Sequence, residues 1–207
     1  MAYFPMFVNL ARRKVLVAGG GKVALRKVQA LKEFGAEISV VAPDILPEFS
    51  ALAGLCLAKR KFRPEDLAGC VLAIAATDSP DENARIAREC RRRKIPVNAV
   101  DEPENCDFYF PATVLRGDIS IGISTSGVAP GCCRELRRLL DENLPPDAGE
   151  TVRAIGLLRR KILAQGRRPA KDAEYAALIE KFARDLEYTL NSHTAWANKQ
   201  EQNRQDL

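Results

Sequence analysis

Three consecutive glycines, Gly19–Gly21, follow a short apolar segment, Val15–Ala18, and Ala24 stands three residues further on. Gly19, Gly21 and Ala24 have the spacing G-x-G-x-x-G/A. In that pattern the first glycine turns the chain sharply, the second admits a pyrophosphate, and the small third residue lets a helix pack closely on the strand. Free N–H groups of the helix then bind the phosphates. The spacing predicts a dinucleotide site, against the alternative of a structural turn, and the candidate cofactor residues are Gly19, Gly20, Gly21, Lys22 and Val23.

The segment Glu37–Ala42 predicts a second strand, which ends before Pro43 and Asp44. An acidic residue at the end of this strand commonly holds the adenine ribose hydroxyls. Here the strand ends in alanine, so either Asp44 or backbone groups must take that role. No lysine or arginine stands between Ala42 and Phe49 to receive a 2′-phosphate. The sequence therefore favours NAD over NADP and adds Pro43 and Asp44 to the cofactor candidates.

The apolar segment Val71–Asp78 predicts a buried parallel strand. Its last residues, Thr77 and Asp78, fall where ligands bind in open α/β sheets, so both are cofactor candidates. Pro96–Val100 predicts a further strand of the same sheet, which is followed directly by Asp101.

Asp101 is the candidate for acid–base chemistry. The chain has one histidine, His193 near the C-terminus, so this chemistry in the main domain falls to carboxylates. The end of a strand would place Asp101 beside the nicotinamide, where a base is useful. Capping of the turn before Pro103 is the alternative.

Strands alternate with helical patterns up to Asp101, which predicts an α/β fold with a Rossmann-like doubly wound parallel sheet. We expect an NAD-binding domain at 1–112, a small α+β dimerisation segment at 113–145, and a C-terminal helical region at 146–207. The other expected elements are a lead-in at 4–10 whose aromatic rings pack on the first strand, a short helix at 45–52, strands at 57–62 and 119–125, and helices at 23–34, 80–94, 130–143, 152–163 and 173–190.

The composition excludes several classes of protein. Of 207 residues, 46% are hydrophobic and 29% charged, with a net charge of +5, which is ordinary for a globular protein. We expect neither a membrane span nor a signal peptide. Six cysteines without a C-x-x-C pair indicate free thiols in a reducing cytoplasm rather than a zinc site or disulfides. The basic run 91–94 closes a helix and lacks interleaved aromatic residues, so we expect no nucleic-acid partner.

Five motifs in this order resemble those of the precorrin-2 dehydrogenase / sirohydrochlorin ferrochelatase family, a module that also forms the N-terminal part of sirohaem synthase. They are VAGGGKVALRK at 17–27, AIAATD at 73–78, VNAVD at 97–101, FYFPA at 108–112 and STSGVAP at 124–130. No single motif is specific, but their combination is.

The resemblance implies NAD-dependent oxidation of the tetrapyrrole precorrin-2 to sirohydrochlorin, with Asp101 as the functional aspartate. It leaves open whether ferrous iron is then inserted to give sirohaem. It also implies a homodimer that uses about residues 113–145. The methyltransferase domain of the fused synthase is absent from this sequence, so we expect precorrin-2 to come from a separate enzyme.

The resemblance also suggests residues for the substrate. Thr125, with Ser126 and Gly127, would receive tetrapyrrole carboxylates or be modified, and helix capping is the alternative for Thr125. Asn98 is either a pocket residue or a satisfied strand side chain. The vicinal Cys132 and Cys133 are more often core residues than iron ligands.

Two other functions are compatible with the sequence. A non-catalytic, NAD-sensing regulatory subunit would share the glycine spacing without needing Asp101. A dehydrogenase that lacks chelatase activity cannot be separated by sequence from a bifunctional enzyme, because chelation requires no metal-ligand motif that can be identified here.

Overall fold

The computed structural model describes the backbone of residues 3–205 and the side chains of residues 3–189, so His193 lies outside the described side chains. The chain separates into two compact units, one of Met6–Phe110 and one of Pro111–Leu207 together with Met1–Pro5. The finer division into segments 1–112, 113–145 and 146–207 remains our proposal for the domain organisation.

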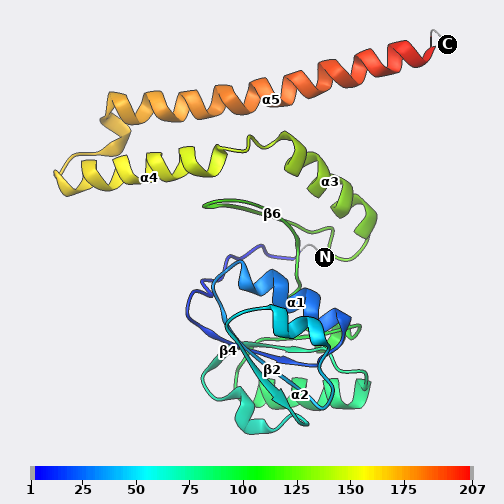
Figure 1. Ribbon diagram of the computed structural model, residues 1–207. Helices are drawn as coiled ribbons and strands as arrows, with labels where there is room; N and C mark the ends of the chain where they lie inside the picture. Colours follow the sequence, from blue (N-terminus) through cyan, green and yellow to red (C-terminus); the bar gives the residue numbers. More distant parts are fainter. Residues whose placement is uncertain (1–2, 206–207) are drawn as a thin grey trace. The chain divides into compact units, whose positions relative to one another are not determined.

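The first unit is built on a five-stranded parallel sheet with the strand order β3-β2-β1-β4-β5. Helix α1 covers one face of the sheet and helix α2 covers the other (Figure 1). The predicted doubly wound α/β fold is therefore confirmed. The elements are β1 (Lys14–Ala18), α1 (Lys22–Lys32), β2 (Glu37–Ala42), β3 (Leu55–Lys59), β4 (Cys70–Ala75), α2 (Pro80–Arg92) and β5 (Val97–Ala99).

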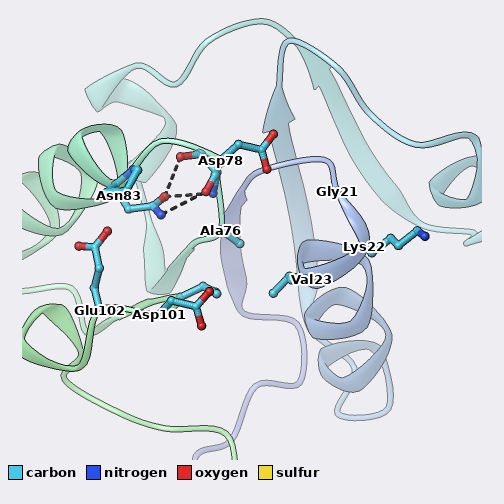
Figure 2. Close-up of a pocket in the computed structure, with 11 residues that line it drawn as sticks. Gly21, Lys22, Val23, Ala76, Asp78, Asn83, Asp101 and Glu102 are labelled. Atoms are coloured by element: carbon cyan, nitrogen blue, oxygen red, sulfur yellow. Dashed lines mark hydrogen bonds between the residues drawn. The ribbon is translucent and has the colours of Figure 1, made fainter.

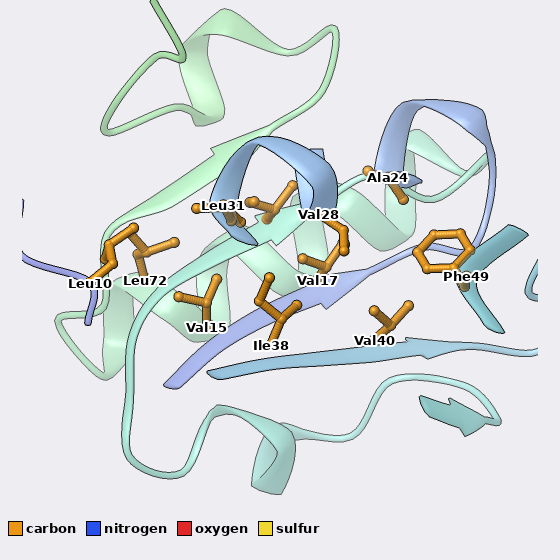
Figure 3. Packing of buried hydrophobic residues seen from close by; sticks show 12 residues of the cluster. Leu10, Val15, Val17, Ala24, Val28, Leu31, Ile38, Val40, Phe49 and Leu72 are labelled. Atoms are coloured by element: carbon orange, nitrogen blue, oxygen red, sulfur yellow. The ribbon is translucent and has the colours of Figure 1, made fainter. Parts of the chain in front are cut away.

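Strand β1 is the centre of this unit because it is buried on both faces. Val15 and Val17 face α1, whereas Leu16 and Ala18 face α2, and none of the four is accessible to solvent. Alternate residues of a strand point to opposite faces, so one apolar run supplies both cores. Figure 3 shows the α1 side, where valine and leucine side chains of the helix pack over β1 and β2.

The N-terminal lead-in differs from the prediction. Phe4 is 88% exposed and Phe7 is 74% exposed, so these rings do not pack on the first strand. Side chains of α1 already fill the face of the sheet beside the lead-in, and only Leu10 joins that cluster.

Two predicted elements between β2 and β4 are corrected in detail. The predicted helix at 45–52 is only a 3₁₀ turn, Pro47–Ala51, which places Phe49 in the core. Strand β3 begins and ends earlier than the predicted 57–62, because residue 62 is a buried phenylalanine beyond the sheet.

The arginines of the basic run at the end of α2 bind to other groups of this chain. Ser79 caps the helix start, and Glu89 binds Arg92 at 2.8 Å and Arg93 at 2.5 Å near its end. The guanidinium groups lower the pKa of Glu89 to about 2. Arg91 donates to the carbonyl of Glu104 at 2.9 Å. These contacts agree with cation placement at a helix C-terminus.

The second unit combines a hairpin with helices. Strands β6 (Ala112–Arg116) and β7 (Ile119–Ile123) pair antiparallel, and they are followed by α3 (Pro130–Asn143), α4 (Ala148–Ala164) and α5 (Ala173–Gln205). Strand β6 was not predicted. Arg116 fastens the hairpin to α3 through the side chain of Asp141 at 2.9 Å and its carbonyl at 2.8 Å. Within residues 3–205, no helix is long and apolar enough to cross a membrane.

Candidate functional site

The glycine turn between β1 and α1 has three glycines with different roles. A Cβ on Gly19, whose φ is +130°, would lie 2.1 Å from the carbonyl oxygen of Ala76, and one on Gly20 would lie 2.1 Å from that of Asp44. A Cβ on Gly21 would meet nothing within 4 Å. The first two glycines thus permit close backbone packing, and the third leaves open space beside the helix.

The open space lies at the N-terminus of α1. Gly21 is the N-cap and supplies no side chain to the N–H groups of the first turn, whose earliest helical bond runs from the Leu25 N–H to the Gly21 carbonyl at 3.0 Å. The preceding N–H groups are left for an anionic oxygen, and the helix dipole favours negative charge there. This cradle fits a dinucleotide pyrophosphate.

A cavity of about 330 Å³ opens beside this cradle at the carboxyl ends of β4 and β5. Figure 2 shows the glycine turn and α1 on one side of this cavity and Asp101 and Glu102 on the other. The structure brings together six predicted site residues here: Gly21, Lys22, Val23, Thr77, Asp78 and Asp101.

Asp101 has an unusual backbone conformation, with φ of +61°. A non-glycine residue in the left-handed region costs free energy and often marks a functional site. Its side chain extends from the end of β5 toward α1 (Figure 2). Asp101 thereby presents a carboxylate to the cavity.

Asn83 on α2 is a cavity residue that the sequence analysis missed. It is 4% exposed, and its Oδ1 accepts from the Thr77 backbone N–H at 3.0 Å and hydroxyl at 2.8 Å. Its Nδ2 donates to the Thr77 carbonyl at 3.2 Å. Asn83 therefore fixes the loop after β4. The signal was available, because Asn83 is the polar member of the buried stripe of α2 that continues with Ile86, Ala87 and Cys90.

Glu102 was also missed, although it directly follows Asp101. Its Oε2 accepts from Asn105 Nδ2 at 2.7 Å. Its Oε1 is enclosed and has no hydrogen-bond partner. Among the described residues, every other enclosed side-chain nitrogen or oxygen has a partner. An enclosed oxygen without a partner is costly, so it needs an explanation.

A second cavity, of about 800 Å³, lies on the β2 side of the glycine turn. Of the predicted cofactor residues it contains Gly19, Gly20, Gly21, Pro43, Asp44, Thr77 and Asp78. Lys59 at the end of β3 and Lys61 also line it. The loop after Ala42 does not reveal these lysines, because they come from another segment of the chain, which the pairing of Ala42 with Lys59 brings beside it.

Lys27 on α1 lies over the ring of Phe110, with Nζ 3.9 Å from the ring centroid. Burial lowers the pKa of this ammonium group, and the neighbouring Arg26 lowers it further. The cation–π contact offsets part of the cost of burying the charge. This contact links Phe110, in the FYFPA motif, to helix α1.

Asn98 lies in the interior and lines neither cavity. It is 6% exposed, and its Nδ2 donates to the Phe108 carbonyl at 2.9 Å. The structure thus favours the satisfied strand side chain over a pocket residue.

The predicted substrate loop lies in the second unit, before α3. Thr125 Oγ1 accepts from the backbone N–H of Ala129, the residue that precedes α3, at 3.2 Å. Ser126 and Gly127 have φ of +54° and +81°, and a Cβ on Gly127 would meet nothing within 4 Å. These two residues turn the chain, and the space beside Gly127 is open.

The vicinal cysteines do not form the expected core. Cys132 is exposed, and the thiol of Cys133 donates to Thr125 Oγ1 at 3.3 Å. Among the described residues, no three His, Cys, Asp or Glu side chains gather in a group that would hold a metal ion.

Comparisons with known proteins agree with this geometry. The family model described as putative NAD(P)-binding matches residues 6–112. The siroheme synthase of Azotobacter vinelandii is 44% identical over 164 residues, which are 77% of this chain and 34% of that protein. The siroheme synthase of Stutzerimonas stutzeri is 40% identical over 169 residues, 80% of this chain and 36% of that protein. The chain thus spans about a third of the length of these relatives.

A solved structure, described as SirC, precorrin-2 dehydrogenase, is similar in fold. The match has a TM-score of 0.62 at 23% identity and covers 90% of this chain and 98% of that one. Both units have counterparts in a single known chain.

Proposed function

Because the chain belongs to the family described as putative NAD(P)-binding, we propose that it oxidises precorrin-2 to sirohydrochlorin with NAD as the electron acceptor. The names of its relatives, siroheme synthase and precorrin-2 dehydrogenase, support this substrate. One observation carries the proposal: the phosphate cradle at Gly21 and the carboxylate of Asp101 line the same cavity.

The residues divide the chemistry between binding and proton transfer. NAD, when bound, supplies the acceptor for two electrons. The first-turn N–H groups of α1 bind its pyrophosphate, and Asn83 holds the Thr77 loop in place. Asp101 accepts a proton that the reduced tetrapyrrole releases, and general-base assistance of this kind contributes about 10²–10⁴ in rate. Its strained backbone fixes the direction of the carboxylate.

We extend the proposal to insertion of ferrous iron into sirohydrochlorin. Iron is a substrate in this step, and its insertion releases protons from the macrocycle. The carboxylate that serves the oxidation, Asp101, can therefore serve the insertion as well. The loop of Thr125, Ser126 and Gly127 would bind the tetrapyrrole carboxylates, because its open helix N-terminus favours anions.

We also propose a cytoplasmic homodimer. All six cysteines are free thiols, as expected in a reducing compartment. Helix α3 is amphipathic but contains no buried residue, and its Leu136 and Leu139 are 46% and 47% exposed. A second copy that covers this face would bury the leucines.

The decisive experiment compares three samples of the full chain: unaltered, Asp101→Asn and Glu104→Gln. Sirohydrochlorin formation from precorrin-2 and NAD is followed by absorbance, and NAD affinity by calorimetry. We expect Asp101→Asn to lower turnover about 10²–10⁴-fold with unchanged NAD affinity, since the substitution keeps shape and removes basicity. Glu104→Gln changes an exposed carboxylate in the same loop and should behave as the unaltered protein. A folded Asp101→Asn protein with near-normal turnover would end the catalytic assignment.

The same assay separates the rival functions. A regulatory subunit would bind NAD and form no sirohydrochlorin. A dehydrogenase without chelatase activity would form sirohydrochlorin and leave added ferrous iron unincorporated. Gly21→Asp should abolish NAD binding while the protein stays folded. The new carboxylate would occupy the open space beside Gly21, where the pyrophosphate binds in our proposal.

A further inference from the structure

The end of strand β2 lacks the side chain that commonly decides between NAD and NADP. An acidic residue there binds the 2′-hydroxyl of the adenine ribose, and its charge repels a 2′-phosphate. In this chain the strand ends in Ala42, whose methyl group does neither. The next acidic residue, Asp44, lies two positions further along, and its backbone carbonyl packs against Gly20. The position that would repel NADP therefore carries no negative charge.

A lysine from the neighbouring strand lies beside that position. Lys59 is the last residue of β3 and pairs with Ala42 in the parallel ladder. Paired residues of neighbouring strands lie about 4.8 Å apart, and their side chains leave the sheet on the same face. Both residues line the cavity of about 800 Å³ on the β2 side of the glycine turn. Lys59 is exposed, so a ligand in this cavity has access to its ammonium group.

The second lysine of this cavity, Lys61, has different surroundings. The pKa of Glu82, which also lines the cavity, is lowered mainly by its hydrogen bond with Arg85, and the charge of Lys61 lowers it further. Lys61 is therefore close to a carboxylate that already balances part of its charge. No ion pair joins Lys59 to a carboxylate of the described residues. Of the two lysines, Lys59 is the one whose charge is left for an anionic ligand.

We infer that Lys59 binds the 2′-phosphate of NADP, so that the chain accepts NADP as well as NAD. The inference rests on the proposed cofactor site, because the adenine ribose lies at the end of β2 when the pyrophosphate binds at the glycine turn. The added phosphate is remote from the nicotinamide. NADP would therefore accept the same hydride from precorrin-2, while Asp101 accepts a proton. In this scheme Lys59 determines cofactor specificity and takes no part in the chemical step.

The test compares NAD with NADP, which differ in the 2′-phosphate alone. We expect the unaltered full chain to bind NADP within about tenfold of NAD by calorimetry, because the ammonium group offsets the charge of the phosphate. Lys59→Gln should weaken NADP binding roughly 3–10-fold and leave NAD binding unchanged. With NADP as the acceptor in the sirohydrochlorin assay, this variant should have a higher KM and an unchanged kcat. Lys61→Gln is the matched control and should weaken NADP binding by less than about twofold.

The other outcomes overturn the inference in recognisable ways. A larger gap between the two cofactors in the unaltered chain would contradict it without any variant, and so would an unchanged NADP affinity in Lys59→Gln. Equal losses for NAD and NADP in Lys59→Gln would assign this lysine to a group that both cofactors share. A larger loss in Lys61→Gln than in Lys59→Gln would assign the 2′-phosphate to the other lysine. If the unaltered chain binds neither cofactor, the proposed NAD site itself is refuted.

Discussion

The two units of this chain differ in how much of their apolar surface they cover. Met6–Phe110 buries apolar side chains on both faces of its sheet, and β1 at its centre is wholly inaccessible along four residues. In the described part of the chain from Pro111 onward, the buried hydrophobic side chains are Val114, Ala148 and Ile162. The first unit is closed by its own packing, whereas the second leaves leucine side chains of its helices exposed.

The reason lies in the architecture of each unit. A parallel sheet with a helix on each face has two cores, so the apolar residues of its inner strands are largely covered within the unit. A two-stranded hairpin with helices on it has little interior, and such a sheet is marginal on its own. The comparison predicts that substitutions in the first unit act on folding and those in α3 act on assembly.

The largest effect should come from the centre of the sheet. Leu16→Ala removes a fully enclosed side chain from the α2-face core, and we expect a loss of about 2–5 kcal/mol in the free energy of unfolding. Urea denaturation of the full chain measures this loss. Leu157→Ala, at a site that is 56% exposed, should change it by no more than about 0.5 kcal/mol. Similar losses at both positions would refute the contrast between the units.

A substitution on α3 should act on assembly instead. We expect Leu139→Asp to convert a micromolar dimer to monomer in sedimentation experiments, because a charge in an apolar interface is unfavourable, with little change in the thermal midpoint of the first unit. Glu135→Gln on the same helix, whose carboxylate is 67% exposed, is the control. An unaltered chain that sediments as a monomer at micromolar concentration would contradict the proposed dimer.

The preference for NAD or NADP tests the role of the cavity on the β2 side of the glycine turn. Lys59 and Lys61 line the β2-side cavity, so we expect them to offset part of the preference for NAD that was based on the lack of a cation between Ala42 and Phe49. We expect the double variant Lys59→Ala, Lys61→Ala to weaken NADP binding roughly 3–10-fold and to leave NAD binding nearly unchanged, as for exposed ion pairs. Calorimetry at two salt concentrations checks this. Unchanged NADP affinity would mean that neither ammonium group reaches the 2′-phosphate.

The smallest effect concerns acid stability at the end of α2. The guanidinium groups of Arg92 and Arg93 lower the pKa of Glu89 to about 2, so the folded state favours the charged carboxylate. This stabilisation is present above the ordinary pKa near 4.5 and is lost as the pH falls toward 2. The stabilisation is modest because these ion pairs lie at the surface. Glu89→Gln should therefore be slightly less stable than the unaltered chain at pH 7, and the difference should vanish near pH 2. A difference that is constant with pH would contradict the assignment.

The sequence by itself determined most elements of the first unit and its glycine turn, but not the 3₁₀ turn Pro47–Ala51 or the bounds of β3. The apolar side chains of Val15–Ala18 and Glu37–Ala42 predict strands because they need cover within a sheet, and β2 has the predicted bounds. The steric roles of Gly19 and Gly21 follow from the absence of a side chain. These properties are local, so the order of residues along the chain is sufficient to predict them.

Only the tertiary structure decided which distant residues share a cavity. Lys59 reaches the β2-side cavity through the pairing of β2 with β3, and Asn83 reaches the other through the packing of α2 on the sheet. The exposure of Phe7 is also a tertiary result, since α1 fills the face that the ring was expected to cover. Strand order and helix packing depend on the competition of all apolar surfaces for the same core, and no local pattern records the outcome of that competition.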